Sequence, residues 1–548
     1  MKPALKIIPL LLILLSCTGS AGFKGQLYIR LNQIGFTPED YKSALILSNE
    51  ELGAAGFGII DASTGKNVLK GNLVPAGTGY ASFNHAYKAD FTELKTGGNY
   101  YLSINGSRSN PFSIGRALFK PLVDSLLAFF RVQRCGYTNP ELHGVCHIAD
   151  ATSVFDGKNN LNVKIDLTGG WHDAGDYVKF LNTTAVATYT LLFAYDFDPV
   201  KFGFDDNKNN IPDILEEAKI GLDWLLRCYY SPLKLVTQVQ DLRDHDVGWR
   251  MPENDKMQFD RPAFLGGGKN LTGIYSAALA LASRIWKDKI KYPEFADRCK
   301  SVAETVYSNR NKVPDLDTSA TGNYRDKNFT GKLALGAYEL YSLTGKKEYL
   351  DDSFGYASKA GSDYWWSWGD INALVHYRLA HFDRKYLSYI ENNLEKFSSV
   401  SAQNLFNNGA NSTWGTNNTL LGISLQAVLW KKITGSTKYD RLAQLQRDFV
   451  LGRNPWGVSF ISGFGYNPVK HLHHQVAFLD GGKVNGALAA GPASKEFITS
   501  QKIKYENGDP YSLFQTDSFY YRDDRMDYVT NEPTIVSNAT ALFVFGVL

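Results

Sequence analysis

Cysteine is scarce in this chain, which contains only five in 548 residues. One of them, Cys17, lies in the N-terminal leader, and the other four are too few to build a disulfide scaffold of this length. An excess of either charge is also missing, because 58 Lys and Arg against 55 Asp and Glu leave a net charge of +3. So small an imbalance gives no reason to expect a nucleic acid or a charged membrane surface as partner.

The N-terminus lacks a hydrophobic run long enough to cross a bilayer. Two lysines precede an apolar stretch at residues 7–15, which is shorter than the roughly 20 residues that a membrane span needs. The Leu-Leu-Ser-Cys that ends at Cys17 resembles the cleavage box of bacterial lipoproteins. We therefore expect residues 1–22 to be a lipoprotein signal peptide and tether, with Cys17 lipidated and the protein exported to the outer membrane. An unlipidated signal with a chance cysteine is the alternative.

The rest of the composition is typical of a soluble globular protein, with 44% hydrophobic and 21% charged residues. The length exceeds one ordinary domain, so we expect two. Residues 23–115 alternate short β-rich runs with turn-forming stretches, which predicts a β-sandwich. No acids, His or Cys gather there, so we interpret it as a packing or accessory module. The expected strands are residues 27–31, 43–47, 57–60, 81–91 and 100–104.

Residues 116–548 change to a helical period and predict one large all-α domain. Two apolar helices end in similar ways, at Gly345 and at Gly435, and each is followed four residues later by a tyrosine. This repeat of helix, glycine cap and docking tyrosine is expected when helical hairpins are reused around a barrel.

Residues 170–179 read Gly-Trp-His-Asp-Ala-Gly-Asp-Tyr-Val-Lys and hold more reactive side chains than any other stretch of this length. Only Ala-Gly separates Asp173 from Asp176, and glycine permits the tight turn that would direct both carboxylates at one water molecule. A carboxylate that activates water needs a partner acid, for which Glu532 is the candidate. The sequence therefore predicts that distant parts of the chain meet in one active site.

A second set combines thiols and imidazoles: Cys135, Cys146, His147 and His172. Two thiolates and two imidazoles suit a tetrahedral zinc ion. The spacing is not that of a zinc finger, so buried free cysteines and hydrogen-bonded histidines remain the alternative.

A third set, at residues 205–216, matches the ligand spacing of a calcium loop. Asn210 stands where such loops prefer glycine, and asparagine tolerates that backbone. The alternative is a polar loop that caps the following helix. The ligands would be the side chains of Asp205, Asn207, Asn209, Asp213 and Glu216 and the carbonyl oxygen of Ile211.

Two further segments lie near the C-terminus. Tyr521, Asp523, Tyr528 and Glu532 precede an apolar helix, where the pKa of a glutamate can be raised as a general acid requires. A Gly-rich, aromatic segment at residues 459–467 leads into a His-rich stretch of the kind that lines pockets.

Together these motifs resemble glycoside hydrolase family 9, the inverting β-1,4-glucanases, over nearly the whole mature chain. Residues 173–176 resemble the family's base motif, residues 521–539 fit its acid-bearing signature, and residues 454–473 resemble its third. Residues 27–115, whose fourth to tenth residues read Arg-Leu-Asn-Gln-Ile-Gly-Phe, look like the immunoglobulin-like module of one family branch.

The resemblance implies an (α/α)6 barrel with an open cleft across one end. Asp176 would be the general base, Asp173 would help to hold the water, and Glu532 would be the general acid. His473 and Asp523 match further active-site positions. Cleft and substrate contacts are expected from His474, Gln475, Trp249, Asp244, His245 and Tyr528. The same branch carries structural zinc and calcium, which supports both predicted metal sites, and neither metal would take part in the chemistry.

One position departs from the family, which usually has arginine where Gln475 stands. Glutamine keeps hydrogen bonds but loses the charge and the bidentate fork. The expected substrate is a soluble or branched β-glucan, such as xyloglucan or mixed-linkage glucan, ahead of cellulose, and the protein is expected to be a monomer. The alternatives are an exo-acting glucosidase or glucosaminidase and a non-catalytic glycan-binding lipoprotein. Candidate stacking platforms, about half of them expected in the core, are Trp171, Trp249, Trp365, Trp366, Trp368, Trp414 and Trp456.

Overall fold

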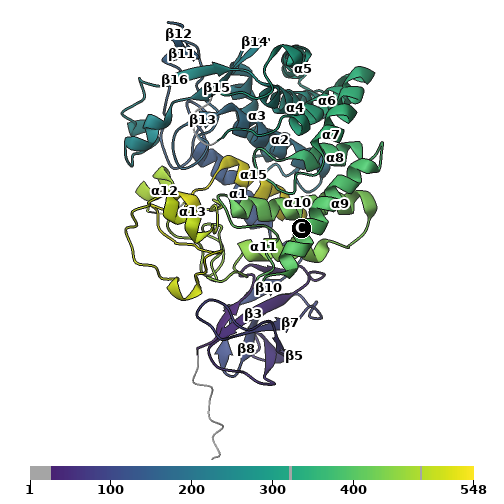
Figure 1. The fold of residues 1–548 in the computed structure, drawn as a ribbon, viewed down its shortest axis with the longest axis vertical. Helices are drawn as coiled ribbons and strands as arrows, with labels where there is room; N and C mark the ends of the chain where they lie inside the picture. Colours follow the sequence, from purple (N-terminus) through teal and green to yellow (C-terminus); the bar gives the residue numbers. More distant parts are fainter. Residues whose placement is uncertain (1–25, 320–323, 482–483) are drawn as a thin grey trace, which may run out of the picture.

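The computed structural model describes residues 26–319, 324–481 and 484–548. The predicted signal peptide and Cys17 lie outside these ranges. A β-rich N-terminal part and a larger helical part are stacked along the long axis of the molecule (Figure 1). None of the helices within the described ranges combines the length and the apolar character that a membrane span requires.

The N-terminal part is a sandwich of two sheets around its own apolar core, as predicted. Between the sheets, the ring of Phe36 meets those of Phe91 and Phe112 edge-on, at centroid distances of 5.5 and 5.7 Å. The five expected strands are present, and five further strands, at residues 35–36, 67–72, 74–75, 107–108 and 112–114, were not expected. One sheet orders β1 (Tyr28–Arg30), β3 (Ser43–Ser48), β7 (His85–Asp90) and β6 (Val74–Pro75). The other orders β2 (Gly35–Phe36), β10 (Phe112–Ile114), β8 (Gly98–Ile104), β4 (Gly56–Asp61) and β5 (Asn67–Asn72), with β9 (Ser107–Arg108) beside β8.

The helical part is a barrel with an inner and an outer ring, which confirms the predicted (α/α)6 fold. The inner helices are α2 (Leu181–Phe197), α4 (Lys269–Ile285), α6 (Thr330–Thr344), α8 (Asn372–Leu379), α10 (Thr416–Thr434) and α15 (Ile535–Val547). Each contacts the next in this order, and α15 closes the ring against α2. The outer helices are α1 (Lys120–Gln133), α3 (Asp213–Arg227), α5 (Pro293–Ser308), α7 (Lys347–Ala360), α9 (Lys385–Ala402) and α11 (Asp440–Val450).

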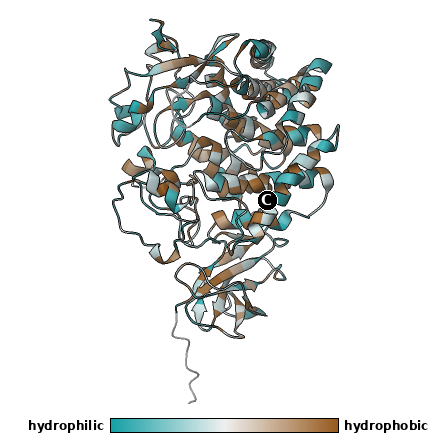
Figure 2. Ribbon diagram, viewed as in Figure 1, coloured by the Kyte–Doolittle hydropathy of each residue, from teal (hydrophilic) through white to brown (hydrophobic). Residues whose placement is uncertain are grey.

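The two rings differ in sequence because they differ in surroundings. Inner helices are packed on all sides, and α15 is predominantly hydrophobic along its length (Figure 2). Outer helices such as α9 bury one face only. The predicted repeat is also present: Gly345 and Gly435 end α6 and α10 in the left-handed conformation, and Tyr349 and Tyr439 are buried behind them.

A third sheet, inside the helical part, was not predicted. It orders β12 (Asn159–Asn160), β11 (Ser153–Asp156), β16 (Pro262–Gly266), β15 (Lys234–Val239) and β13 (Lys179–Phe180), with β14 (Tyr229–Ser231) beside β15. The pairing of β13 with β15 begins only three residues after Asp176. The sheet therefore fixes the backbone immediately after the loop at residues 173–176.

The interface between sandwich and barrel contains buried polar groups beside its apolar contacts. Arg447 on α11 forms ion pairs with Asp40 at 3.0 Å and with Asp448 at 2.9 Å. Asn32 donates to Asp448 at 2.8 Å. Arg447, Asp40 and Asp448 therefore balance one another at this interface.

A buried ionic cluster joins α2, α4, α6 and α8. Asp196 pairs with Arg284 and with Arg378, each at 2.8 Å. Glu339 pairs with Arg378 at 2.9 Å and accepts a hydrogen bond from the Tyr189 hydroxyl at 2.7 Å. Because Glu339 is fully buried, its charge has to be balanced inside the protein.

We expect Glu339→Gln to lower the free energy of unfolding by about 3–5 kcal/mol, because it leaves two arginines facing one carboxylate in a buried place. Urea denaturation followed by circular dichroism measures the change. Asp351→Asn, which breaks the exposed Lys347–Asp351 pair on neighbouring α7, is the control and should change little. Equal losses in the two variants would show that the cluster does not stabilise the barrel.

Candidate active site

The loop at residues 173–176 is enclosed by segments from the far end of the chain. Gln475 donates its backbone N–H to the Gly175 carbonyl at 3.0 Å, and Gly175 donates its own N–H to Glu532 Oε1 at 3.3 Å. A Cβ on Gly175 would lie 2.1 Å from the carbonyl oxygen of His473, so only glycine fits. Asp176 and Glu532 therefore lie in one site although they are 356 positions apart.

Glu532 follows the short helix α14 (Tyr528–Asn531), whose first turn is capped by the Asp527 side chain. Ile535 then donates its N–H to the Asp173 carbonyl at 3.0 Å. The acid-bearing segment and the base-bearing loop thus hold each other through backbone hydrogen bonds.

Asp176 is held in its charged form. Burial alone would raise its pKa, but the hydrogen bond from His245, with Nε2 2.9 Å from Oδ2, and the N–H of Val178 outweigh burial, and the pKa lies below its ordinary value. The same contact raises the pKa of His245 to about 9. Asp176 keeps 19% of its side chain exposed, so a water molecule can reach it.

Glu532 has the opposite environment. Burial and the nearby charge of Asp176 raise its pKa well above the ordinary value, although the Gly175 N–H and the His245 charge act against this. Two neighbouring carboxyl groups whose pKa values are pushed apart can serve as base and acid at the same pH.

Asp173 is almost fully buried and accepts a hydrogen bond from the Thr183 hydroxyl. Burial raises its pKa to about 7, while Thr183 and the nearby Tyr324 hydroxyl act in the lowering direction. Tyr324, which was not expected here, packs edge-on against Phe180 and Trp368 at 4.9 and 5.3 Å. A single tyrosine 151 positions from Asp173 carries no sequence signal for this role.

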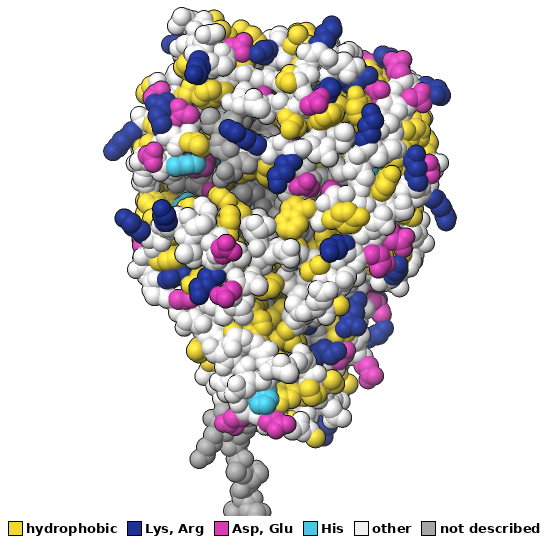
Figure 3. All heavy atoms as spheres, viewed as in Figure 1, with side chains coloured by type: hydrophobic (Ala, Val, Ile, Leu, Met, Phe, Trp, Pro, Cys, Tyr) yellow, Lys and Arg dark blue, Asp and Glu magenta, His cyan; other side chains and the backbone are white. Residues whose placement is uncertain are grey.

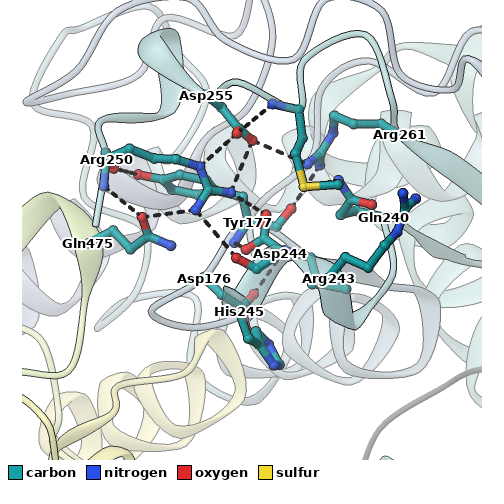
Figure 4. A network of polar contacts seen from close by, with 12 residues as sticks. Asp176, Tyr177, Gln240, Arg243, Asp244, His245, Arg250, Asp255, Arg261 and Gln475 are labelled. Carbon is teal, nitrogen blue, oxygen red and sulfur yellow. Dashed lines mark hydrogen bonds and ion pairs between the residues drawn. The ribbon is translucent and has the colours of Figure 1, made fainter. Parts of the chain in front are cut away.

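Two other residues that support the loops were also missed. Gln133 donates through Nε2 to the carbonyls of Ala174 at 2.6 Å and His172 at 3.1 Å, and its Oε1 lies 2.6 Å from His474 Nε2. The second is Arg250, at the centre of the polar network in Figure 4.

Arg250 pairs with Asp244 at 2.5 Å and with Asp255 at 2.6 Å. Its backbone N–H and Nη1 donate to Gln475 Oε1 at 3.0 and 3.4 Å, on the other side of the network in Figure 4. Asp244 in turn accepts the N–H of Tyr177 at 3.1 Å. A guanidinium therefore does lie beside position 475, but it belongs to Arg250 and is bound to buried carboxylates.

The predicted substrate contacts divide by burial. Trp249, His473 and Tyr528 are half-buried neighbours: the His473 ring meets Trp249 at 5.1 Å and Tyr528 at 5.8 Å. His473 Nδ1 donates to the Arg525 carbonyl at 2.6 Å, which leaves Nε2 for a ligand. Half of the His245 side chain is also exposed.

Asp523, His474, Asp244 and Gln475 are buried instead. Asp523 accepts the N–H groups of Lys470 and His471 at 3.1 and 2.8 Å, and both nitrogens of His474 lie against protein groups. Substrate contact by His474, Asp244 and Gln475 stays a prediction, as does a catalytic role for Asp523, and burial favours a supporting role for all four. Of the seven tryptophans named as candidate stacking platforms, Trp171, Trp366 and Trp456 are core residues, in line with the expectation that about half would be.

Cys135, Cys146, His147 and His172 come together as predicted, with their ligand atoms all within 4.8 Å of one another. All four are buried, and no other such group of His, Cys, Asp or Glu occurs in the part of the chain that the structure describes. His147 Nε2 donates to Asp255 at 2.9 Å, which directs Nδ1 at the cluster.

The charges around the cluster favour a thiolate at Cys135, whereas Cys135 and burial raise the pKa of Cys146. Lys179 Nζ lies 3.7 Å from Cys135 Sγ. Burial would raise the pKa of Cys135, but the Cys146 contact and the Lys179 charge outweigh it and hold that pKa well below its usual range. The donor set therefore fits a tetrahedral metal ion.

The predicted calcium loop precedes α3 and curls around its first ligand position. Asp205 accepts the N–H groups of Asn209 at 3.1 Å and Asn210 at 2.8 Å, and Asn210 has a positive φ of 70° where such loops prefer glycine. Asp213 Oδ1 is buried without a hydrogen-bond partner among the described residues. These features fit a calcium loop, and calcium stays a prediction.

The sequence matches Glycosyl hydrolase family 9 over residues 119–545 and the Cellulase N-terminal ig-like domain over residues 25–109. It is 26% identical over 489 residues to Endoglucanase D of Acetivibrio thermocellus, covering 83% of this chain and 75% of that protein. It is also 26% identical over 581 residues to the xyloglucan-specific endo-beta-1,4-glucanase of Bacteroides ovatus, covering 96% and 94%. The crystal structure of a metagenome-derived glycoside hydrolase family 9 endoglucanase matches with a TM-score of 0.80 and 26% identity, covering 95% of this chain and 98% of that one.

We expect Cys146→Ser to prevent metal binding by the cluster, because a serine hydroxyl replaces a thiolate ligand. Elemental analysis of purified protein measures the metal content, and the melting temperature should fall with it. Cys228→Ser is the matched control, since Cys228 is a buried cysteine outside the cluster. An unchanged metal content in Cys146→Ser would exclude this cluster as the ligand set.

Proposed function

Because the chain belongs to glycosyl hydrolase family 9 and is therefore a glycoside hydrolase of β-1,4-glucans, we propose that it acts by inversion, with Asp176 as base and Glu532 as acid. The observation that carries this proposal is the opposite pKa shift of two carboxyl groups joined through the backbone of Gly175. A general base has to be ionised and a general acid protonated at the same pH.

In the proposed reaction, Glu532 gives its proton to the glycosidic oxygen as the bond from that oxygen to the anomeric carbon breaks. Asp176 takes a proton from a water molecule that attacks the anomeric carbon from the opposite face. Asp173, fixed by Thr183, helps to hold this water. The product then has the inverted anomeric configuration, and Asp176 and Glu532 return to their starting states by exchanging protons with solvent.

For the substrate, we infer a soluble or branched β-glucan such as xyloglucan. The likeness to the xyloglucan-specific enzyme of Bacteroides ovatus over nearly the full length of both chains supports this choice. Exo-action on short oligosaccharides is the second candidate, which stays open because Gln475 stands where the family usually has arginine.

A non-catalytic glycan-binding role has less support. Three acidic groups gathered in one site lower the stability of the protein, and so does the separation of the pKa values of Asp176 and Glu532. Neither feature would increase the affinity of a protein that only binds glycan.

We further propose that the metals are structural. Zinc suits the two cysteines and two histidines of the cluster, and calcium suits the oxygen ligands of residues 205–216. When bound, the zinc ion would hold the loop at residues 135–147 against His172, next to Asp173. The leader supports export as a lipoprotein anchored through Cys17 at the outer membrane, and the protein is proposed to act as a monomer.

Asp176→Asn and Glu532→Gln should each reduce kcat about 10²- to 10⁴-fold, because each removes one partner of the proton transfer. Reducing-sugar release from xyloglucan and mixed-linkage glucan measures this, and proton NMR of the first product gives its anomeric configuration. Asp351→Asn, far from the site on α7, is the control. Unchanged turnover in either active-site variant, or retention of configuration, would refute the assignment.

His245→Asn should shift the pH profile of kcat/KM toward higher pH. The His245 charge and hydrogen bond lower the pKa of Asp176, and its charge also lowers that of Glu532. Without it, Asp176 is protonated at a higher pH on the acidic limb, and Glu532 loses its proton at a higher pH on the alkaline limb. His85→Asn, on β7 of the sandwich, should leave both limbs in place. A profile that does not move would show that His245 does not control these carboxylates.

A further inference from the structure

Gln33 belongs to the N-terminal sandwich, yet every hydrogen bond of its side chain goes to the backbone of the barrel. Its Nε2 donates to the Gly457 carbonyl at 2.7 Å. Its Oε1 accepts the N–H groups of Tyr466 and Asn467, both at 2.8 Å. One N–H and both acceptor positions of the side-chain amide are thus used on one segment, and the residue is only 6% exposed.

Two glycines of the barrel form a close-fitting space for this side chain. A Cβ on Gly452 would lie 2.5 Å from Gln33 Nε2, and a Cβ on Gly465 would lie 2.8 Å from Gln33 Oε1. Both glycines have positive φ angles, of 115° and 95°, which other residues rarely adopt. An interface that only joined two modules would not need a cavity shaped around one amide.

The backbone that Gln33 holds continues directly into the active site. Ser459 donates to the Asn467 carbonyl at 2.9 Å and accepts the N–H of Val469 at 2.8 Å, so this segment is a narrow ladder. Six residues beyond Asn467, His473 donates its N–H to the Asn531 carbonyl at 3.1 Å. Asn531 immediately precedes Glu532, the proposed acid.

We propose that Gln33 is a positioning residue for the reaction, and that the sandwich is part of the catalytic apparatus and not only an accessory. This inference rests on the proposed function. Gln33 fixes residues 457–467, and through the ladder it sets the position of His473 and of the backbone next to Glu532. Without the amide, the partly buried N–H groups of Tyr466 and Asn467 lose their acceptor, and the segment has to shift to satisfy them.

Other contacts of the same interface provide a control. Asp40 pairs with Arg447 at 3.0 Å and accepts a hydrogen bond from Gln444 at 3.1 Å, both on α11. These contacts attach the sandwich to an outer helix and do not touch the ladder. Loss of Asp40 should therefore weaken the interface without moving the active site.

The test compares Gln33→Met, Gln33→Glu and Asp40→Asn in the full-length protein. On soluble cello-oligosaccharides, Gln33→Met should lower kcat/KM on the order of ten- to a hundredfold, mostly in kcat, because small displacements of positioned groups are costly. Gln33→Glu should lose less, since a carboxylate still accepts both N–H groups and only the bond donated to the Gly457 carbonyl is lost. Asp40→Asn should lower the melting temperature but leave kcat and KM unchanged.

Hydrogen–deuterium exchange supplies a readout that does not depend on turnover. The amides of residues 466–473 should exchange faster in Gln33→Met and stay protected in Asp40→Asn. Unchanged exchange in Gln33→Met, or equal loss of kcat in Asp40→Asn, would overturn the inference. If the unmutated protein cleaves no β-glucan, the proposed function fails, and the exchange data still decide whether Gln33 orders the segment.

Discussion

The active site depends on one steric constraint, which is that position 175 has no side chain. Three segments meet there: the base-bearing loop itself, the segment of His473 that lies against the Gly175 Cα, and Glu532, which accepts the Gly175 N–H. Any side chain at this position would collide with the His473 carbonyl. The separation of the pKa values of Asp176 and Glu532 follows from this approach, because each carboxyl group experiences the other in a place with little water.

The parts of the site that could be predicted from the sequence are those whose residues belong to short motifs. Asp173, Asp176, the thiol and imidazole cluster and the helix caps at Gly345 and Gly435 can be identified because their spacing is local. The positions of Tyr324, Gln133 and Arg250 depend on how distant loops pack, and a single tyrosine, glutamine or arginine has no distinguishing pattern. The small sheet around β15 was missed for a similar reason, since its strands are two to six residues long and pair across distant segments.

The departure at Gln475 changes meaning once its surroundings are known. In the sequence, glutamine in place of arginine means the loss of a charge and of a bidentate fork at this position. In the structure the side-chain carbonyl of Gln475 is the acceptor for Arg250, whose guanidinium is neutralised by Asp244 and Asp255.

Charged groups of both signs are interspersed over the face seen in Figure 3, in keeping with a net charge near zero. Recognition of a neutral polysaccharide depends on a complementary binding surface and on hydrogen bonds more than on the electrostatic field of the protein.

The sandwich and the barrel share buried groups whose partners lie on opposite sides of their boundary: Gln33 with the Gly457 backbone, and Asp40 with Arg447. Genetic recombination that exchanged one module for that of a distant relative would separate these pairs and leave polar atoms buried without partners. The two modules are therefore constrained to be inherited together, and their boundary is a poor crossover point for laboratory shuffling as well.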